Sequence, residues 1–374
     1  MKIQRFGQLA GMAVVGALAL SACGSDNNSP GAGSGGSASG GSSASADCAK
    51  GTLNAEGSSA QKNAIEEAIT TFQDSCEGAT VNYNPTGSGA GIKQFIAGQV
   101  DFAGSDSALK KTEKDGKIET AEAEKFCGSP AWNLPMVTGP IAVAYNVKGV
   151  DKLVLTPEVI ANIFSGKITT WNDAAIAKIN SGVSLPSEPI KVFFRSDESG
   201  TTENFTKYLK AAAPNAWSAE PAKSWTGKGE GKEKSAGVAS AVQSTEGGIT
   251  YAEWSYAKDN KLGIAQVDNG GGAVELSGES VGKAVAAAKP DGEGNDLRLK
   301  LDYTTKEAGA YPILLVTYEI VCSKAKDPAK VDLVKAFLTH FSSKETQASL
   351  EDIGYAPLPD EVRTKVDAAI AALS

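Results

Sequence analysis

The spacing of apolar residues switches repeatedly between a helical and a strand-like pattern along the first part of the chain. Apolar side chains recur at helical spacing over residues 61–74, and a second helical pattern covers residues 91–97. Short apolar runs at residues 81–83 and 100–103 predict strands. This alternation predicts an α/β domain with a mainly parallel sheet, whose ligands lie beyond the carboxyl ends of the strands.

A second set of such elements lies between two longer β-prone runs. The runs cover residues 135–145 and 311–322, and the elements between them include a helix near residues 157–164, a strand at 190–194 and a helix at about 202–213. Three helical patterns finish the chain, the last at residues 362–373. The order of these elements predicts a second α/β unit inserted between the two runs.

The two long β-prone runs predict two crossovers between two lobes. The chain would leave the first lobe near residues 139–147 and return near residues 309–316. We therefore expect residues 48–140 and 312–374 to form lobe one and residues 141–311 to form lobe two, both α/β. The paired crossover strands would act as a hinge that closes around a ligand.

The first 47 residues read as an export signal and a tether. Lys2 and Arg5 precede an apolar run at residues 9–20, which is too short to span a bilayer comfortably. The run ends in Leu-Ser-Ala-Cys23, which resembles a bacterial lipobox, so we expect a signal peptide at residues 1–22 and acylation, palmitate included, of Cys23. The alternative is an ordinary signal peptide with a chance cysteine. Residues 23–47 are rich in Gly, Ser and Ala and predict a flexible tether.

Charge and cysteine content narrow the class of protein. The net charge of −8 argues against binding to nucleic acid, but it does not exclude a small anion in a buried site. Four cysteines remain besides Cys23, and three disulfide pairings are possible. The predicted crossover strands bring Cys127 near Cys322, so we favour that bond together with Cys48–Cys76. Wide cysteine spacing and a single histidine argue against a metal site, and no cofactor is expected.

Three segments place polar residues at the carboxyl ends of predicted strands. Residues 85–91 put three glycines and Ser88 before a helix, where N–H groups can meet an anion. Residues 100–106 end in Asp106, and residues 195–201 carry an arginine whose planar fork suits a tetrahedral oxyanion. Each segment alone has a plainer explanation: a turn, a helix cap, or a surface ion pair.

In order and spacing, these segments resemble the periplasmic phosphate-binding proteins of ABC importers. The resemblance covers nearly all of residues 48–360, including residues 81–91, 100–106, 163–173 and 195–201. It implies a two-lobed α/β fold of the type II periplasmic-binding-protein class, with the ligand cleft between lobes joined by two crossover strands.

The resemblance also implies which residues bind phosphate. In the first loop Ser59 would supply a hydroxyl and Ala60 its N–H, although Ala60 lacks the large apolar side chain that the family carries there. The other implied contacts are Ser88, Asp106, Arg195, Ser199, Gly200 and Thr201, with Asp197 as the partner that holds Arg195.

A single acceptor among many donors predicts selectivity for phosphate over sulfate. An ionised Asp106 can only accept hydrogen bonds, so it favours a ligand that still carries a proton. Phosphate carries one at neutral pH and sulfate does not. The alternatives are a receptor for sulfate or molybdate, an exported phosphatase, and an adhesive surface lipoprotein. A phosphatase would need a nucleophile with a base, or clustered metal ligands.

We therefore expect a monomeric, non-enzymatic receptor for inorganic phosphate, lipid-anchored on the extracytoplasmic face of the cell membrane. Its partner would be an ABC permease of two transmembrane subunits with a cytoplasmic ATPase. Trp171 and His340 are expected to be structural, and the charge-rich stretches 110–125 and 223–234 are expected to be solvated surface.

Overall fold

The computed structural model describes residues 48–113 and 116–374. The predicted signal peptide (residues 1–22), lipidated Cys23 and tether (residues 23–47) lie outside the described residues. Within the part of the chain that is described, no helix is both long and apolar enough to cross a membrane.

The chain begins with parallel strands that alternate with helices. Strand β1 (Gly51–Gly57) lies between β2 (Ala79–Asn84) and β3 (Phe102–Ser105) and is parallel to both. Helices α1 (Lys62–Ser75), α2 (Ser88–Ile96) and α3 (Glu119–Cys127) follow these strands in turn. Helix α1 buries Ala64, Ile65, Ala68 and Phe72, the apolar face that the spacing predicted. The α/β prediction for this part of the chain is confirmed.

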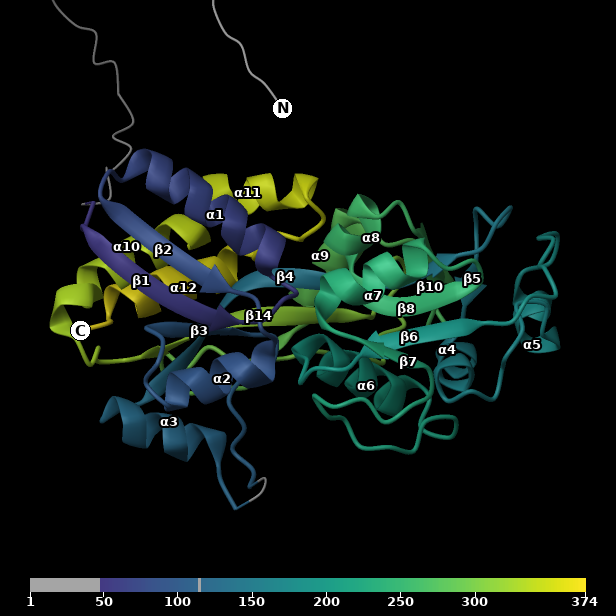
Figure 1. Ribbon diagram of the computed structural model, residues 1–374, viewed down its shortest axis with the longest axis horizontal. Helices are drawn as coiled ribbons and strands as arrows, with labels where there is room; N and C mark the ends of the chain where they lie inside the picture. The colour runs from purple at the N-terminus through teal and green to yellow at the C-terminus, as the bar shows by residue number, and fades with distance from the viewer. Residues whose placement is uncertain (1–47, 114–115) are drawn as a thin grey trace, which may run out of the picture. The chain divides into compact units, whose positions relative to one another are not determined.

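Two long antiparallel strands run through the middle of the main sheet. Strand β4 (Ala131–Asn146) pairs with β14 (Leu314–Cys322), and the register is interrupted between Thr317 and Tyr318. The strand order is β2-β1-β3-β14-β4-β8-β6-β7, so these two strands join the first set of elements to the second (Figure 1). The two β-prone runs are therefore paired as predicted, while the exact lobe limits stay a prediction.

The second set of elements again combines parallel strands with helices. Strand β6 (Lys191–Arg195) is parallel to β7 (Glu230–Lys232) and to β8 (Gly248–Glu253). The helices are α4 (Pro157–Phe164), α5 (Ala174–Ile179), α6 (Gly200–Ala212), α7 (Lys234–Gln243), α8 (Trp254–Asp259) and α9 (Gly278–Ala286). The shorter strands are β5 (Val154–Leu155), β9 (Gly263–Ile264), β10 (Gln266–Asp268), β11 (Ala273–Val274), β12 (Lys289–Pro290) and β13 (Leu299–Lys300).

The end of the chain returns to the first set of elements. It forms η1 (Pro328–Lys330), α10 (Val331–Ser342), α11 (Lys344–Asp352) and α12 (Asp360–Ala371). Helix α10 contacts β1 and α1, and α11 lies beside α1 (Figure 1). The rings of Phe72 in α1 and Phe337 in α10 meet edge to face, with centroids 5.5 Å apart. His340 is half-buried and bonds to Thr71 Oγ1 at 2.8 Å, which agrees with a structural role.

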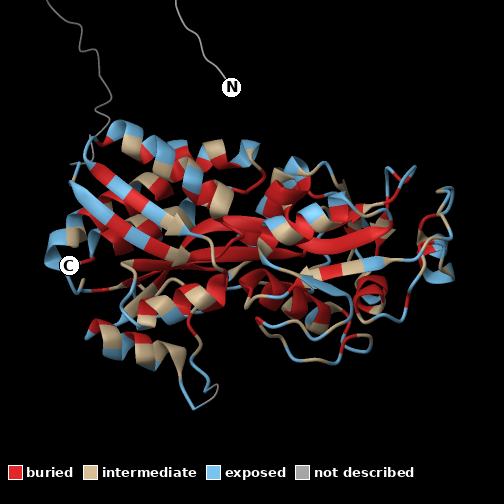
Figure 2. Ribbon diagram, viewed as in Figure 1, coloured by how far each residue is buried: buried red, intermediate tan, exposed pale blue. Residues whose placement is uncertain are grey.

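Buried side chains follow the central strands. Figure 2 shows β4, β14 and β8 buried along nearly their whole length. Trp171 is fully buried, and its Nε1–H donates to the carbonyl of Gly247 at 3.2 Å, so its expected packing role is confirmed.

Disulfides join Cys48 to Cys76 and Cys127 to Cys322. Cys127 ends α3 and Cys322 ends β14, so the second bond ties a helix to a crossover strand. Both favoured pairings are present.

Candidate functional site

The first loop of the site begins where β1 comes very close to β3. Gly57 has φ +146°, and a Cβ there would lie 2.0 Å from the carbonyl oxygen of Gly104, so this position requires glycine. The next residues, Ser58, Ser59 and Ala60, are all buried. The close approach of the two strands therefore carries a pair of hydroxyls to the carboxyl end of the sheet.

The two serines of this loop have different partners. Ser58 Oγ donates to Asp106 Oδ1 at 2.5 Å and accepts from the Ala60 N–H at 3.0 Å. Ser59 Oγ lies 3.1 Å from the Ser235 hydroxyl, which belongs to α7. The Ala60 N–H, expected to face a ligand, is thus bonded to Ser58 in this structure.

Asp106 lies directly after β3 and is the acceptor at the centre of the network. Its Oδ1 accepts from the hydroxyls of Ser58 and Thr317 at 2.5 and 2.7 Å, and its Oδ2 accepts from Ser88 Oγ at 3.0 Å. Burial raises the pKa of Asp106 to about 6, against the opposing effect of these three hydroxyls. At neutral pH Asp106 is therefore mostly ionised, and its Oδ2 accepts only one hydrogen bond in the network.

Arg195 ends β6 and is held in place by Asp197. Its Nε and Nη2 donate to the two Asp197 oxygens at 2.7 and 2.5 Å, which is a bidentate pair. Burial disfavours the charged form of both side chains. The hydrogen bonds and the charge attraction between Arg195 and Asp197 outweigh this effect, so the pKa of Arg195 is raised and that of Asp197 is lowered. The third arginine nitrogen, Nη1, donates to Ser235 Oγ at 3.0 Å and to Thr201 Oγ1 at 3.4 Å.

Helix α6 starts at this site. Ser199 caps it by accepting from the Thr202 N–H at 3.1 Å, and Thr201 Oγ1 donates to Glu253 Oε1 at 2.5 Å. A Cβ at Gly200 would lie 2.6 Å from both Asp106 Cβ and Ser88 Oγ. Gly200 therefore lets α6 approach the first set of elements closely.

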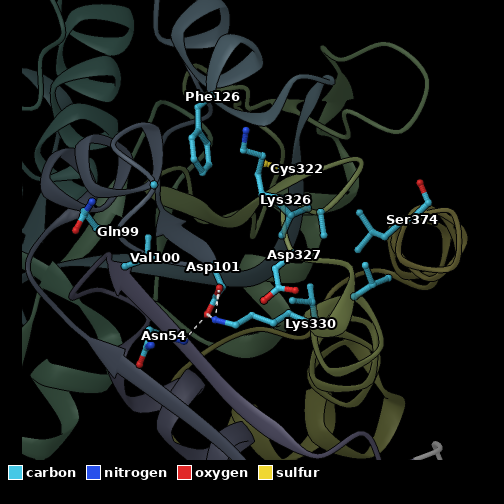
Figure 3. Close-up of a pocket in the computed structure, with 16 residues that line it drawn as sticks. Asn54, Gln99, Val100, Asp101, Phe126, Cys322, Lys326, Asp327, Lys330 and Ser374 are labelled. Carbon is cyan, nitrogen blue, oxygen red and sulfur yellow. Dashed lines mark hydrogen bonds and ion pairs between the residues drawn. The ribbon is translucent and has the colours of Figure 1, made fainter.

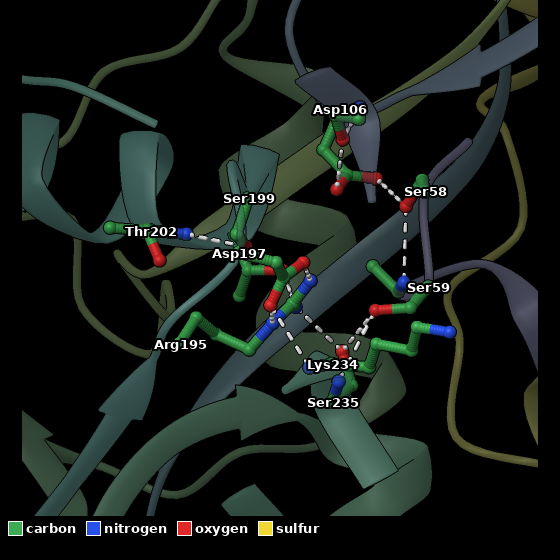
Figure 4. A network of polar contacts seen from close by, with 12 residues as sticks. Ser58, Ser59, Asp106, Arg195, Asp197, Ser199, Thr202, Lys234 and Ser235 are labelled. Carbon is green, nitrogen blue, oxygen red and sulfur yellow. Dashed lines mark hydrogen bonds and ion pairs between the residues drawn. The ribbon is translucent and has the colours of Figure 1, made fainter. Parts of the chain in front are cut away.

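The contacts described above bring all nine sequence-predicted residues into one neighbourhood. Figure 4 labels five of them: Ser59, Asp106, Arg195, Asp197 and Ser199. Asn204 of α6 donates to the Asp106 carbonyl at 2.7 Å, and Ser59 meets Ser235, so both sets of elements contribute. Within the described residues, no cluster of His, Cys, Asp or Glu could hold a metal ion.

Several members of the network were not predicted from the sequence, among them Ser58, Thr317, Ser235, Glu253 and Asn204. The expectation that residues 223–234 form solvated surface is wrong in part. Lys223 is buried and pairs with Glu119 at 3.1 Å, β7 lies inside the stretch, and Ser235 follows it directly. The glycines and charged residues of this stretch are typical of an exposed loop, so the sequence did not predict the N-terminus of α7 at Lys234.

One hollow borders this network, and others lie away from it. A groove of about 800 Å³ beside Asp106 and Asn204 is lined by several basic side chains, including Lys110, Lys207 and Arg298. A separate pocket of about 410 Å³ lies between the start of β3 and the C-terminus, where Lys330 pairs with Asp101 at 2.9 Å (Figure 3). The second pocket contains none of the predicted site residues.

Comparison with known proteins identifies a family to which this chain is similar. Residues 42–345 match the model of the PBP superfamily domain. The chain is 47% identical to phosphate-binding protein PstS 3 of Mycobacterium tuberculosis over the full length of both proteins. It is 35% identical to phosphate-binding protein PstS of Xylella fastidiosa, over 78% of this chain and 77% of that one.

Solved structures show the same fold. A phosphate-binding protein from Stenotrophomonas maltophilia aligns with a TM-score of 0.66 and 21% identity, over 85% of this chain and 93% of that one. A high-affinity periplasmic phosphate-binding protein, solved with phosphate, aligns with a TM-score of 0.67 and 23% identity, over 85% and 93%. The expected two-lobed α/β periplasmic-binding fold is confirmed. This chain therefore belongs to the PBP superfamily, in the family of the PstS phosphate-binding proteins.

Proposed function

We propose that this protein binds inorganic phosphate outside the cytoplasm and delivers it to an ABC phosphate importer. Its full-length similarity to proteins named for phosphate binding supports this function, and it supports a solute-binding protein that performs no catalysis. The observation that carries the proposal is a buried network in which the Asp106 carboxylate, the Arg195 guanidinium and several hydroxyls from separate loops lie together.

The proposed ligand contacts come from both sets of elements. Ser59, Ala60, Ser88 and Asp106 belong to lobe one, taken as residues 48–140 and 312–374. Arg195, Ser199, Gly200 and Thr201 belong to lobe two, taken as residues 141–311, with Asp197 orienting the arginine. Hydroxyls and N–H groups that now bond to one another would turn to the phosphate oxygens when the ligand enters.

Asp106 is the proposed source of selectivity. Its Oδ2 accepts a single hydrogen bond in the network, so it can accept another from a protonated phosphate oxygen. Sulfate has no proton at neutral pH and would place a lone pair against the carboxylate. Sites that demand a missing hydrogen bond discriminate by up to ~10⁴-fold or more.

The proposed cellular form is a monomer tethered by a lipid on Cys23, at the extracytoplasmic face of the membrane. The lipobox-like segment and the Gly/Ser-rich residues 24–46 support the lipid anchor and the tether. Mass spectrometry of the natural N-terminus tests it, because a mature chain that lacks an acylated Cys23 would remove the anchor.

Calorimetric titration with phosphate, sulfate, molybdate and glycerol phosphate tests the function. We expect saturable binding of phosphate alone at low ligand concentration. Incubation with p-nitrophenyl phosphate, followed by an assay for released phosphate, should show no turnover. Tighter binding of sulfate or molybdate would contradict the proposal, and so would release of phosphate from the ester.

A further inference from the structure

A second carboxylate, Glu253, lies in the same network as the proposed phosphate contacts. It ends β8 and is fully buried. Its Oε1 accepts a hydrogen bond from Thr201 Oγ1 at 2.5 Å, while its Oε2 has no hydrogen-bond partner among the described residues. A buried carboxylate oxygen without a partner is costly, so its presence beside an anion site requires an explanation.

The hydrogen bond from Thr201 limits what that residue can offer a ligand. A hydroxyl has one proton to donate. Thr201 gives its proton to Glu253 and already accepts from Arg195 Nη1 at 3.4 Å. While Glu253 stays ionised and keeps this bond, Thr201 cannot donate to a phosphate oxygen.

Arg195 is the one cation among the described titratable groups that face Glu253, and its direct bidentate bond goes to Asp197, so it attracts Glu253 without pairing with it. The titratable groups that face it are Asp106 after β3, Arg195 of β6, Tyr256 of α8 and Tyr355 before α12. Burial raises the pKa of both tyrosines, so they stay neutral, and Arg195 is already paired with Asp197. Besides burial, the charge of Glu253 contributes to the raised pKa of Asp106.

Phosphate would therefore enter a network with two carboxylates, Asp106 and Glu253, whose direct side-chain partners among the described residues are hydroxyls rather than cations. Dibasic phosphate carries one proton, and Asp106 takes it as a hydrogen bond. The remaining negative charge of the ligand then meets Glu253 in a place that excludes water, where like charges repel strongly.

We propose that Glu253 couples phosphate binding to the uptake of one proton from solvent. This inference rests on the proposed function. The proton can add to the phosphate oxygen that faces Thr201, converting dibasic to monobasic phosphate. Alternatively it can add to Glu253, which then releases the Thr201 hydroxyl to donate to the ligand. Both routes consume one proton from the solvent for each dibasic phosphate bound.

The test counts protons by calorimetry. Phosphate is titrated into the full-length protein at about pH 8 in two buffers of different ionisation enthalpy, and the difference in heat gives the number of protons taken up. We expect about one proton per phosphate for the natural protein and close to none for Glu253→Gln. Glu253→Asp keeps the carboxylate and should retain the uptake, which a merely structural role for Glu253 would not predict.

Glu319→Gln is the matched control. Glu319 is also fully buried, its two oxygens have no hydrogen-bond partner among the described residues, and burial raises its pKa to about 8. This variant should keep the uptake of the natural protein. Uptake that disappears in Glu319→Gln but persists in Glu253→Gln would overturn the proposal.

The natural protein alone also decides the question if a variant fails to fold. Saturable phosphate binding without proton uptake would overturn this inference and leave the proposed function standing. Absence of any phosphate binding would remove both.

Discussion

The protein buries two carboxylates close together in two opposite ways. Asp106 and Glu203 are 3% and 4% exposed. Asp106 is surrounded by hydroxyls, and burial raises its pKa to about 6. Glu203 lies 3.3 Å from Lys207 and 3.5 Å from Lys110, and these lysines together with Lys223 outweigh burial and lower its pKa.

The difference shows what each neighbourhood is suited for. Cations stabilise a buried carboxylate fully, whereas neutral dipoles compensate its burial only in part. A cation beside Asp106 would take the lone pairs that a protonated ligand needs. Hydroxyls leave Asp106 ionised and still able to accept, so the site loses some stability in exchange for recognition.

Removing Arg195, the cation that pairs with Asp197, should have the largest effect on phosphate binding. We expect Arg195→Ala to weaken phosphate binding by about 2–5 kcal/mol, because a buried charge-assisted contact is lost and Asp197 loses its bidentate partner. Titration calorimetry measures the loss. Arg195→Lys keeps the charge without the planar fork, so its phosphate affinity should lie between those of the natural protein and Arg195→Ala. Unchanged affinity in Arg195→Ala would mean that the third loop does not contact phosphate.

Replacing Asp106 by asparagine should remove the acceptor while keeping its shape. We expect the preference for phosphate over sulfate, ~10⁴-fold or more in the natural protein, to fall by about 100-fold or more, because an amide nitrogen can donate to sulfate. Competition titrations with both anions give the ratio. Ser88→Ala is the control, since it removes a donor and should weaken both anions together. An unchanged ratio in Asp106→Asn would remove the argument from the ligand proton.

The same substitution should stabilise the empty protein. The folded pKa of Asp106 lies above the unfolded value, so its ionisation costs stability as pH rises from about 4 to about 6, and the cost persists above that range. Asp106→Asn should gain about 2–3 kcal/mol at neutral pH and almost nothing near pH 3. Urea unfolding at both pH values measures this difference, and a loss of stability at neutral pH would contradict it.

Glu203→Gln should change stability in the opposite direction and by a smaller amount. The lowered pKa of Glu203 means that it stabilises the fold above its unfolded pKa, and that this contribution is lost as pH falls through the folded pKa. We expect a loss of about 1–2 kcal/mol at neutral pH, because the partly exposed Lys110 and Lys207 keep access to solvent while a charged partner is removed. Equal effects of Glu203→Gln and Asp106→Asn would show that the two neighbourhoods do not differ.

Much of the site could be read from local sequence. Glycine-rich turns after apolar runs predicted where Ser88, Asp106 and Arg195 would lie, because strand ends and helix N-termini follow from spacing within a few residues. The nearby Asp197 was recognised as the partner of Arg195 for the same reason. The apolar face of α1 and the pairing of β4 with β14 also follow from patterns along the chain.

Other contacts depend on segments that are distant in the chain. Thr317 reaches Asp106 only because β14 lies between β3 and β4, and Ser235 reaches Arg195 only because β7 adds to the edge of β6. Glu253 accepts the hydrogen bond from Thr201 because β8, which it ends, pairs with β6. Sheet order and register decide these meetings, and both arise from packing of the whole chain, which no local pattern contains.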